Sequence, residues 1–429
     1  MNCAIRWIKS KRMLSLAILL ISIVLIGCNQ SENKKETNVN KTAKQILGNP
    51  KYQAISYGGY RMTSRNIQPS VALLKEDLLI MHAMGIRVLR TYNVHLAHAS
   101  NVLKAISELG AQDSSFEMYV MLGAWIDCKN AWTDIPPIHN EESDRNAKEI
   151  DKAVKLANQY PDIVKVIAVG NEAMVKWATT YYVEPWIILK WVKHLQAIKS
   201  EGGLPSDLWI TSSDNFASWG GGEDVYKVNE LNELIKSVDF ISMHTYPMHD
   251  THYNPDFWHE LESEQNYTDS VKIERAMERS LAYAKNQYDS VVAYMKSKGI
   301  DKPVYIGETG WASSSDGHYG EDGSGACDEY KQKLYHDKMR AWTNENNISC
   351  FFFEAFDEQW KDAGNSRGSE NHFGLFDIDG KAKYALWDEV NKGTFKGLGR
   401  NGTAVEKTFN GDYDKLKQSI LVSSPALVD

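Results

Sequence analysis

The sequence predicts an α/β protein in which eight parallel strands alternate with helices and close into a single (β/α)8 TIM barrel. From about Tyr52 onward, short β-branched or aromatic runs alternate with amphipathic helical stretches, a pattern typical of βα units around a parallel sheet. The alternation repeats eight times, as a closed barrel of this kind requires. No glycine-rich phosphate loop follows the first run, which disfavours the alternative of an open, doubly wound sheet.

The expected strands are the short runs rich in β-branched and aromatic residues. They cover residues 53–58, 87–92, 118–124, 164–169, 208–212, 238–243, 304–307 and 350–356. Apolar residues at helical spacing predict helices between them, among them 72–84, 147–159, 186–199, 273–298 and 328–344. Many of these patterns end at Gly or Asn, as helix C-termini prefer.

The N-terminus resembles an export signal. Four Lys or Arg residues among the first 12 precede an apolar run over 13–27 that is too short for a stable membrane span. The run ends in Leu25-Ile26-Gly27-Cys28, which resembles the bacterial lipobox, whose cysteine is lipidated and becomes the N-terminus after cleavage. An ordinary signal peptide or an uncleaved anchor is the alternative. We therefore expect a chain anchored to a bacterial membrane by lipid on Cys28, facing the periplasm or the cell exterior.

This interpretation divides the chain into four parts. Residues 1–27 form the signal peptide, 28–47 the lipidated Cys28 and a flexible tether, and 48–395 the barrel. The polar, Asn/Lys/Glu-rich composition after Cys28 predicts the flexibility of the tether. Residues 396–429 follow the last helix, and we expect them to pack on the barrel as a C-terminal extension.

Charge and cysteine content exclude several classes of function. The formal net charge of −8 argues against nucleic acid or an anionic lipid surface as a partner, because both require a basic surface. If Cys3 leaves with the signal and Cys28 carries lipid, only Cys128, Cys327 and Cys350 remain in the fold. Their spacing matches no zinc or redox motif, so we expect buried thiols and leave a Cys128–Cys327 disulfide open.

Two carboxylates stand at strand ends. The fourth expected strand runs into Gly170-Asn171-Glu172, and the seventh runs into Gly307-Glu308. Chemistry in a (β/α)8 barrel is carried out at the C-terminal ends of the strands. Glycoside hydrolysis requires two carboxyl groups flanking the scissile bond, one protonated and one ionised. Glu172 and Glu308 are therefore the candidate catalytic pair.

Four motifs resemble those of glycoside hydrolase family 17, the β-1,3-glucanases and their relatives, over roughly residues 52–387. These motifs are Val169-Gly170-Asn171-Glu172, Gly307-Glu308-Thr309-Gly310-Trp311, the segment 352–361 (FFEAFDEQWK) and His372-Phe373-Gly374-Leu375-Phe376. The resemblance implies that Glu172 is the general acid/base, that Glu308 is the nucleophile and that Asn171 binds the sugar 2-hydroxyl. The chain departs from the family at Ala312 and Gln359, where proline is common, and neither position carries a reacting group.

The resemblance and the strand ends together suggest further substrate-binding residues. By resemblance, Tyr246 hydrogen-bonds the nucleophile, and Glu358, Lys361 and Glu370 form a charged set that holds Glu172 or sugar hydroxyls, with a surface salt-bridge cluster as the alternative for this set. Trp311 is the expected stacking ring for a sugar. The ends of the second, third and fifth strands add polar and aromatic candidates, namely Arg90, Tyr92, Asn93, Trp125, Asp127, Asp214 and Asn215.

A divalent-metal hydrolase is the rival enzyme class, suggested by His244, His249, Asp250 and His252. Their spacing matches no common ligand motif, so we expect no metal and no cofactor. The resemblance implies a retaining hydrolase of β-1,3-glucosidic bonds in glucans such as laminarin, of the glucan endo-1,3-β-glucosidase type, and we expect a monomer. A β-1,3-glucanosyltransferase and a non-catalytic glucan-binding lipoprotein are the alternatives, and endo against exo action stays open.

Overall fold

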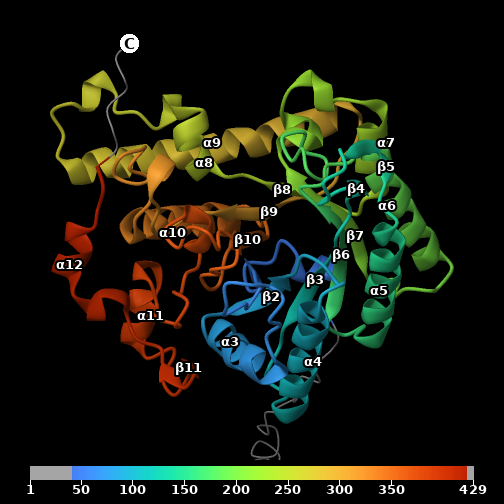
Figure 1. Ribbon diagram of the computed structural model, residues 1–429, viewed down its shortest axis with the longest axis horizontal. Coiled ribbons are helices and arrows are strands. Elements are labelled where there is room, and N and C mark those ends of the chain that lie inside the picture. Colours follow the sequence, from blue (N-terminus) through green and yellow to red (C-terminus); the bar gives the residue numbers. More distant parts are fainter. Residues whose placement is uncertain (1–40, 423–429) are drawn as a thin grey trace, which may run out of the picture. The chain divides into compact units, whose positions relative to one another are not determined.

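Eight parallel strands form a closed barrel in the computed structural model, which describes residues 41–422 (Figure 1). Around the barrel the strands follow the order β1-β10-β9-β8-β7-β6-β3-β2. The predicted (β/α)8 fold is therefore confirmed. The barrel strands are β1 (Gln53–Ser56), β2 (Ile86–Arg90), β3 (Tyr119–Ala124), β6 (Val164–Asn171), β7 (Trp209–Asn215), β8 (Ile241–His244), β9 (Val304–Gly310) and β10 (Cys350–Phe353).

Helices alternate with these strands and surround the barrel (Figure 1). Several begin as their sequences predict: the Ser70 side chain accepts a hydrogen bond from the backbone of Leu73, the Asp328 side chain accepts one from Lys331, and Pro185 opens another helix. The helices that follow strands are α3 (Val71–Ala83), α4 (Ala97–Gln112), α5 (Arg145–Gln159), α6 (Pro185–Ser200), α7 (Asn229–Ser237), α8 (Pro247–Tyr253), α9 (Asp269–Ser297), α10 (Glu329–Glu345) and α11 (Trp387–Lys392).

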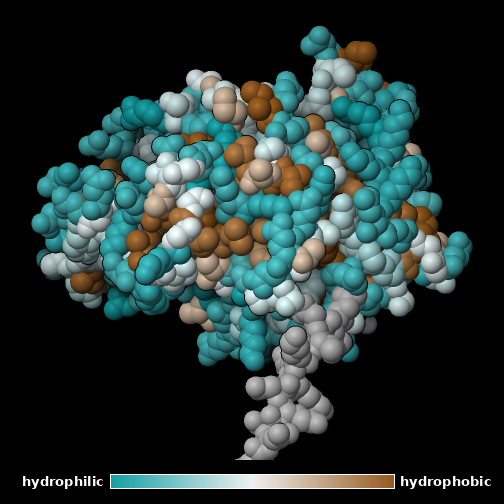
Figure 2. Space-filling view, turned by 90° about the horizontal axis from the view of Figure 1, so that it is seen from below, coloured by the Kyte–Doolittle hydropathy of each residue, from teal (hydrophilic) through white to brown (hydrophobic). Residues whose placement is uncertain are grey.

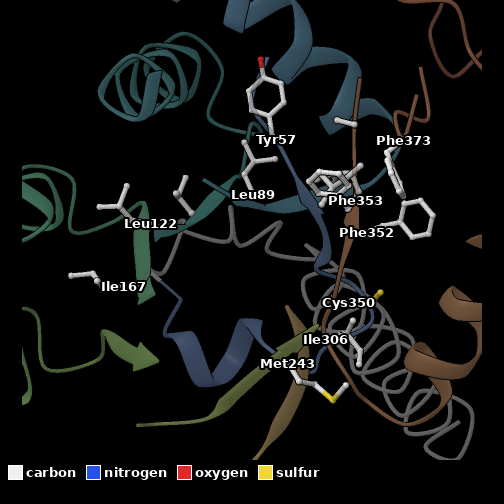
Figure 3. Close-up of a cluster of buried hydrophobic side chains, with 14 of the residues drawn as sticks. Tyr57, Leu89, Leu122, Ile167, Met243, Ile306, Cys350, Phe352, Phe353 and Phe373 are labelled. Carbon is white, nitrogen blue, oxygen red and sulfur yellow. The ribbon is translucent and has the colours of Figure 1, made fainter. Parts of the chain in front are cut away.

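Alternating strand residues divide the core into two layers. Inside the barrel, Val88, Met121 and Val166 belong to one buried cluster. Their neighbours Leu89, Leu122 and Ile167 belong to a second cluster that extends to the helices, and Figure 3 shows part of it. Side chains of a strand point alternately to its two faces. Because both faces are covered, the strands are apolar almost throughout, as expected for a buried parallel sheet.

The beginning of the described chain closes the barrel at the N-terminal ends of the strands. Helix α2 (Ala43–Ile46) precedes β1, and Ile46, Leu47 and Tyr52 are buried in the interior cluster. The Gly48 N–H donates to the Ser349 hydroxyl at 2.8 Å, just before β10 begins. The tether predicted over residues 28–47 is therefore wrong at its end, because apolar burial outweighs the polar composition after residue 41. Cys3, Cys28 and the rest of residues 1–40 lie outside the described part.

The C-terminal extension contacts α3 and α10. Arg400, in the hairpin of β11 (Gly399–Arg400) and β12 (Thr403–Ala404), is fully buried and donates to Asp77 on α3 at 2.9 Å. The Lys331 side chain on α10 pairs with Asp328 and donates to the carbonyl of Leu421 at 2.5 Å. Helix α12 (Tyr413–Gln418) and the hairpin are drawn in red in Figure 1.

The cysteines within residues 41–422 are free thiols. Cys128, Cys327 and Cys350 are all buried, and the Cys327 sulfur lies 3.6 Å from the sulfur of Met248. On the face shown in Figure 2, hydrophilic side chains surround smaller groups of apolar ones. Among the helices described, none combines the length and the apolar character needed to cross a membrane.

Candidate active site

Glu172 and Glu308 lie at the same mouth of the barrel. The pairing register shifts between Ala168 and Asn171 in β6, and β9 has an irregular register against its neighbours just before Glu308. Such an irregularity re-aims the side chains that follow it. Glu172 has a φ of 45°, a left-handed conformation that is uncommon for residues other than glycine and recurs at functional sites. The backbone thus turns both carboxylates toward each other.

The two carboxylates are close and share a histidine. One oxygen of Glu172, one oxygen of Glu308 and a ring nitrogen of His244 all lie within 4.8 Å of one another. The His244 Nδ1 is 3.1 Å from Glu172 Oε1 and 3.6 Å from Glu308 Oε2. Its Nε2 is 2.8 Å from the Ser213 hydroxyl, which is 2.8 Å from the Ser242 hydroxyl. This chain of polar groups orients the imidazole between the catalytic pair.

Glu308 is buried and held in its ionised form. Arg90 donates to its Oε1, and the Tyr246 hydroxyl donates to its Oε2 at 2.8 Å. Burial favours the neutral carboxyl, but the electrostatic influence of His244, the charge of Arg90 and the hydrogen bond from Tyr246 outweigh it and lower the pKa of Glu308 to about 2. An ionised carboxylate at neutral pH is what a nucleophile requires.

Glu172 has a different environment. Its side chain is 26% exposed, against 7% for Glu308, so it faces the solvent-filled cleft. Beneath it, Asp214 accepts a hydrogen bond from the backbone of Met174 at 2.8 Å and so fixes the turn that follows Glu172. Burial raises the pKa of Asp214 to about 7, with the charge of Glu172 adding to the increase. A carboxyl open to the cleft can exchange protons with substrate and water.

Arg90 connects the carboxylate of Glu308 to the side-chain amide of Asn171. Its guanidinium is 1% exposed and donates to Asn171 Oδ1 at 2.5 Å as well as to Glu308. The geometry fixes the Asn171 side chain beside the catalytic pair. Sequence reasoning placed Arg90 only among the cleft residues, because its pairing with Glu308 depends on barrel closure, which brings residues 218 positions apart together.

A large cleft surrounds the pair. It has a volume of about 1710 Å³, larger than the roughly 300–1,000 Å³ of a typical small-molecule site. Aromatic side chains line it, including Trp125, Trp132 and Tyr181 from the loops after β3 and β6, and Tyr60 and Trp360 from those after β1 and β10. Such a cleft fits an extended ligand with apolar faces.

The structure places most of the predicted binding residues along this cleft. Glu358 accepts hydrogen bonds from the Tyr60 backbone and from the Trp360 indole, each at 2.9 Å. Lys361 donates to Glu354 and lies 3.6 Å from Glu358. Glu358 and Lys361 therefore contact each other, Glu354 and the neighbouring loops, and neither binds Glu172. The predicted binding residues that line the cleft are Tyr92, Asn93, Trp125, Asp127, Asn171, Asn215, Tyr246, Glu358, Lys361 and Glu370.

The expectation that Trp311 stacks on a sugar is wrong. Its ring is fully buried, its indole N–H donates to the Ala326 carbonyl at 2.8 Å, and it packs against Trp258 and Tyr335 with centroid distances of 5.7 and 5.0 Å. It belongs to the wall behind the strand. The cleft carries Trp360 instead, which the sequence marks by its position two residues after Glu358.

His244 was considered in the sequence only as a metal ligand. Within residues 41–422, Glu172, His244 and Glu308 are the single group of three or more side chains positioned to hold a metal ion. Arg90 and Tyr246 already bind both oxygens of Glu308. A cation there would be repelled by the guanidinium and would have to displace it, so this set fits a metal poorly. Of the other residues considered for a metal, His249 lies 3.5 Å from Glu370.

Comparison with known proteins identifies relatives of the whole barrel. The crystal structure of an endo-laminarinase from Formosa Hel1_33_131 is 62% identical, with a TM-score of 0.90 over 91% of this chain and 99% of that one. A glycoside hydrolase family 17 β-1,3-glucanosyltransferase from Rhizomucor miehei shares the fold, at 20% identity and a TM-score of 0.54 over 78% of this chain and 96% of that one.

Curated relatives are more distant. A glucan endo-1,3-β-glucosidase of Solanum lycopersicum is 25% identical over 244 residues, which are 54% of this chain and 69% of that protein. The chain spans only 39% of the length of a related Aspergillus niger protein. The model of the BtgE/BtgC glycoside hydrolase domain matches residues 54–374, which contain the barrel and both carboxylates. The chain therefore belongs to the BtgE/BtgC glycoside hydrolase domain family and is a glycosidase.

Proposed function

We propose that this glycosidase is a retaining endo-β-1,3-glucanase of glycoside hydrolase family 17 that cleaves glucans such as laminarin. One observation carries the mechanism: the ionised, buried Glu308 has a carboxylate oxygen within 4.8 Å of one on Glu172. Retaining glycosidases hold their two carboxyl groups about 5–5.5 Å apart, whereas inverting ones separate them by about 6.5–9.5 Å to admit a water. The spacing supports direct attack by Glu308.

The proposed reaction has two steps. Glu308 attacks the anomeric carbon while Glu172 donates a proton to the glycosidic oxygen, so that the C1–O bond breaks and a glycosyl-enzyme forms. Glu172 then takes a proton from water, which attacks the same carbon and releases the carboxylate of Glu308. Arg90 and Tyr246 hold Glu308 in place through both steps.

The substrate is proposed from the comparisons and the cleft. A protein that is 62% identical over nearly its full length is named an endo-laminarinase. A cleft of about 1710 Å³ lined by aromatic rings suits several neutral sugar units in a row. The family 17 assignment rests on the four sequence motifs that surround Asn171, Glu308, Glu358 and Phe373.

Incubation with laminarin tests the proposal. We expect wild type to release oligosaccharides of mixed length whose first-formed anomer, followed by NMR, is β. Glu308→Ala should release none. An inactive wild type, or one active only on mixed-linkage glucan, would contradict the proposal. Products longer than a defined oligosaccharide substrate would instead indicate transfer of the glycosyl group to a sugar hydroxyl, as in a β-1,3-glucanosyltransferase.

We also propose that the protein is a monomer anchored to a bacterial membrane through lipid on Cys28. The basic N-terminus, the apolar run and Leu25-Ile26-Gly27-Cys28 support the anchor. Labelling of expressing cells with a radioactive fatty acid tests it: wild type should take up label and fractionate with membranes, and Cys28→Ser should do neither. Retention of label by Cys28→Ser would contradict the assignment.

A further inference from the structure

Three aromatic side chains form a cluster on one side of the cleft. The rings of Trp132 and Tyr181 are stacked, with a centroid distance of 5.0 Å and an interplanar angle of 17°. Trp125 lies against both, at 5.3 Å from Tyr181 and 6.3 Å from Trp132. All three line the cleft. Trp132 comes from the loop between β4 (Cys128–Lys129) and β5 (Ile138–Glu142), a hairpin that the strand-and-helix pattern did not predict.

The cluster begins next to the catalytic pair. Burial raises the pKa of Tyr181, and the negative charges of Glu172, Asp214 and Glu308 raise it further, so the Tyr181 hydroxyl lies within electrostatic reach of the catalytic carboxylates. Trp132 continues the cluster on the ring face of Tyr181. Tyr181 and Trp132 therefore line the same cleft as Glu172 and Glu308, as one continuous aromatic surface.

Trp132 exposes its indole at a cost in backbone strain. Tyr181 covers one face of the Trp132 ring, yet Trp132 remains 54% exposed. It has a φ of 63°, a left-handed conformation that bulky residues rarely adopt. The hairpin is fixed in this geometry, because Arg145 donates to the Ala131 carbonyl at 3.2 Å and to Asp127 at 2.7 Å. Burial cannot explain why the loop holds a large apolar ring toward the cleft.

We propose that Trp132, supported by Tyr181 and Trp125, is a binding site for a pyranose unit of the glucan chain away from the scissile bond. This inference rests on the proposed β-1,3-glucanase function. The C–H face of a neutral pyranose packs well on an aromatic ring, and the free face of Trp132 is continuous with the cleft that holds the reacting sugar. Only a chain long enough to extend from Glu308 to Trp132 gains from this contact. The site therefore makes the enzyme prefer long chains.

Kinetics on substrates of two lengths test this inference. Trp132→Ala should raise KM for laminarin about tenfold, equivalent to about 1.4 kcal/mol of binding free energy, with kcat little changed. KM for the shortest laminari-oligosaccharide that wild type cleaves should change less than about twofold. Trp132→Phe, which keeps an aromatic face, should recover most of the affinity.

Ile135→Ala is the matched control. Ile135 lies on the same hairpin and is 60% exposed, but it does not line the cleft, so its removal should leave KM unchanged for both substrates. An equal change for long and short substrates in Trp132→Ala, or no change for either, would overturn the inference while leaving the glucanase proposal intact. An inactive wild type would overturn the glucanase proposal itself, and the inference with it.

Discussion

His244 and Arg90 both lower the pKa of Glu308, the proposed nucleophile, and Arg90→Met tests the contribution of the guanidinium. The pKa of Glu308 is about 2, below its usual value of 4.5. A neighbouring opposite charge lowers the pKa of a carboxyl by about 1–3 pH units. Loss of the guanidinium should therefore bring the pKa of Glu308 to between about 3 and 5. Because the nucleophile acts ionised, the acid limb of kcat/KM should move upward by the same amount.

The assay is the pH dependence of kcat/KM on laminarin between about pH 2.5 and 7, with folding at each pH checked by circular dichroism. Arg400→Met is the control, because it removes another fully buried guanidinium that pairs with a carboxylate outside the cleft. It should leave the profile unchanged. If Arg90→Met remains folded and its acid limb stays with that of wild type, the charge of Arg90 does not maintain the ionised nucleophile and our reasoning is refuted.

Three further changes should have separate effects. Tyr246→Phe removes the 2.8 Å hydrogen bond to Glu308 and should lower kcat/KM about 10- to 100-fold in steady-state kinetics, since a bond to a charged group contributes roughly 1.5–3 kcal/mol; an unchanged value would contradict its role. Arg400→Met should lower the free energy of unfolding in urea by about 3 kcal/mol, because it leaves Asp77 buried with less compensation; a loss below about 0.5 kcal/mol would show that the pair is not stabilising. Burial raises the pKa of Asp214 to about 7, so its neutral form stabilises the native state fully below about pH 4 and this contribution is lost as the pH rises through about 7. Asp214→Asn should flatten that part of the stability profile in urea melts across this range, and a profile as steep as that of wild type would assign the titration elsewhere.

All eight strands were predictable because apolar runs covered on both faces leave a strong signal. The ends of the strands were less predictable. The expected strand over 238–243 begins only at Ile241, because Val238 caps the end of α7. The strand expected to reach 356 ends at Phe353, because the backbone of Glu354 bonds instead with the segment at Phe373 and Leu375. In the first case the preceding helix α7 takes the backbone hydrogen bond of Val238. In the second case a segment farther along the chain takes those of Glu354.

The meeting of Glu172 and Glu308 at one mouth of the barrel was predictable because the fold fixes where strand ends meet. The surroundings were not, since they depend on contacts between distant segments. Trp311 follows the nucleophile by three residues, but its indole N–H finds the carbonyl of Ala326, and the ring turns into the wall. His244 lies between the carboxylates only because β8 and β9 pair with a shifted register there. Local pattern gives no information on either contact.

Ile46, Leu47 and Tyr52 close the floor of the barrel, so its two ends differ: one is closed and the other opens into the cleft. The described chain enters at the end where the strands begin, and the proposed catalytic carboxylates of Glu172 and Glu308 lie where the strands finish. The chain before residue 41 therefore joins the barrel at its floor, while Glu172 and Glu308 lie at the opposite mouth. A polymer that enters the cleft does not have to cross the point at which the chain enters the barrel.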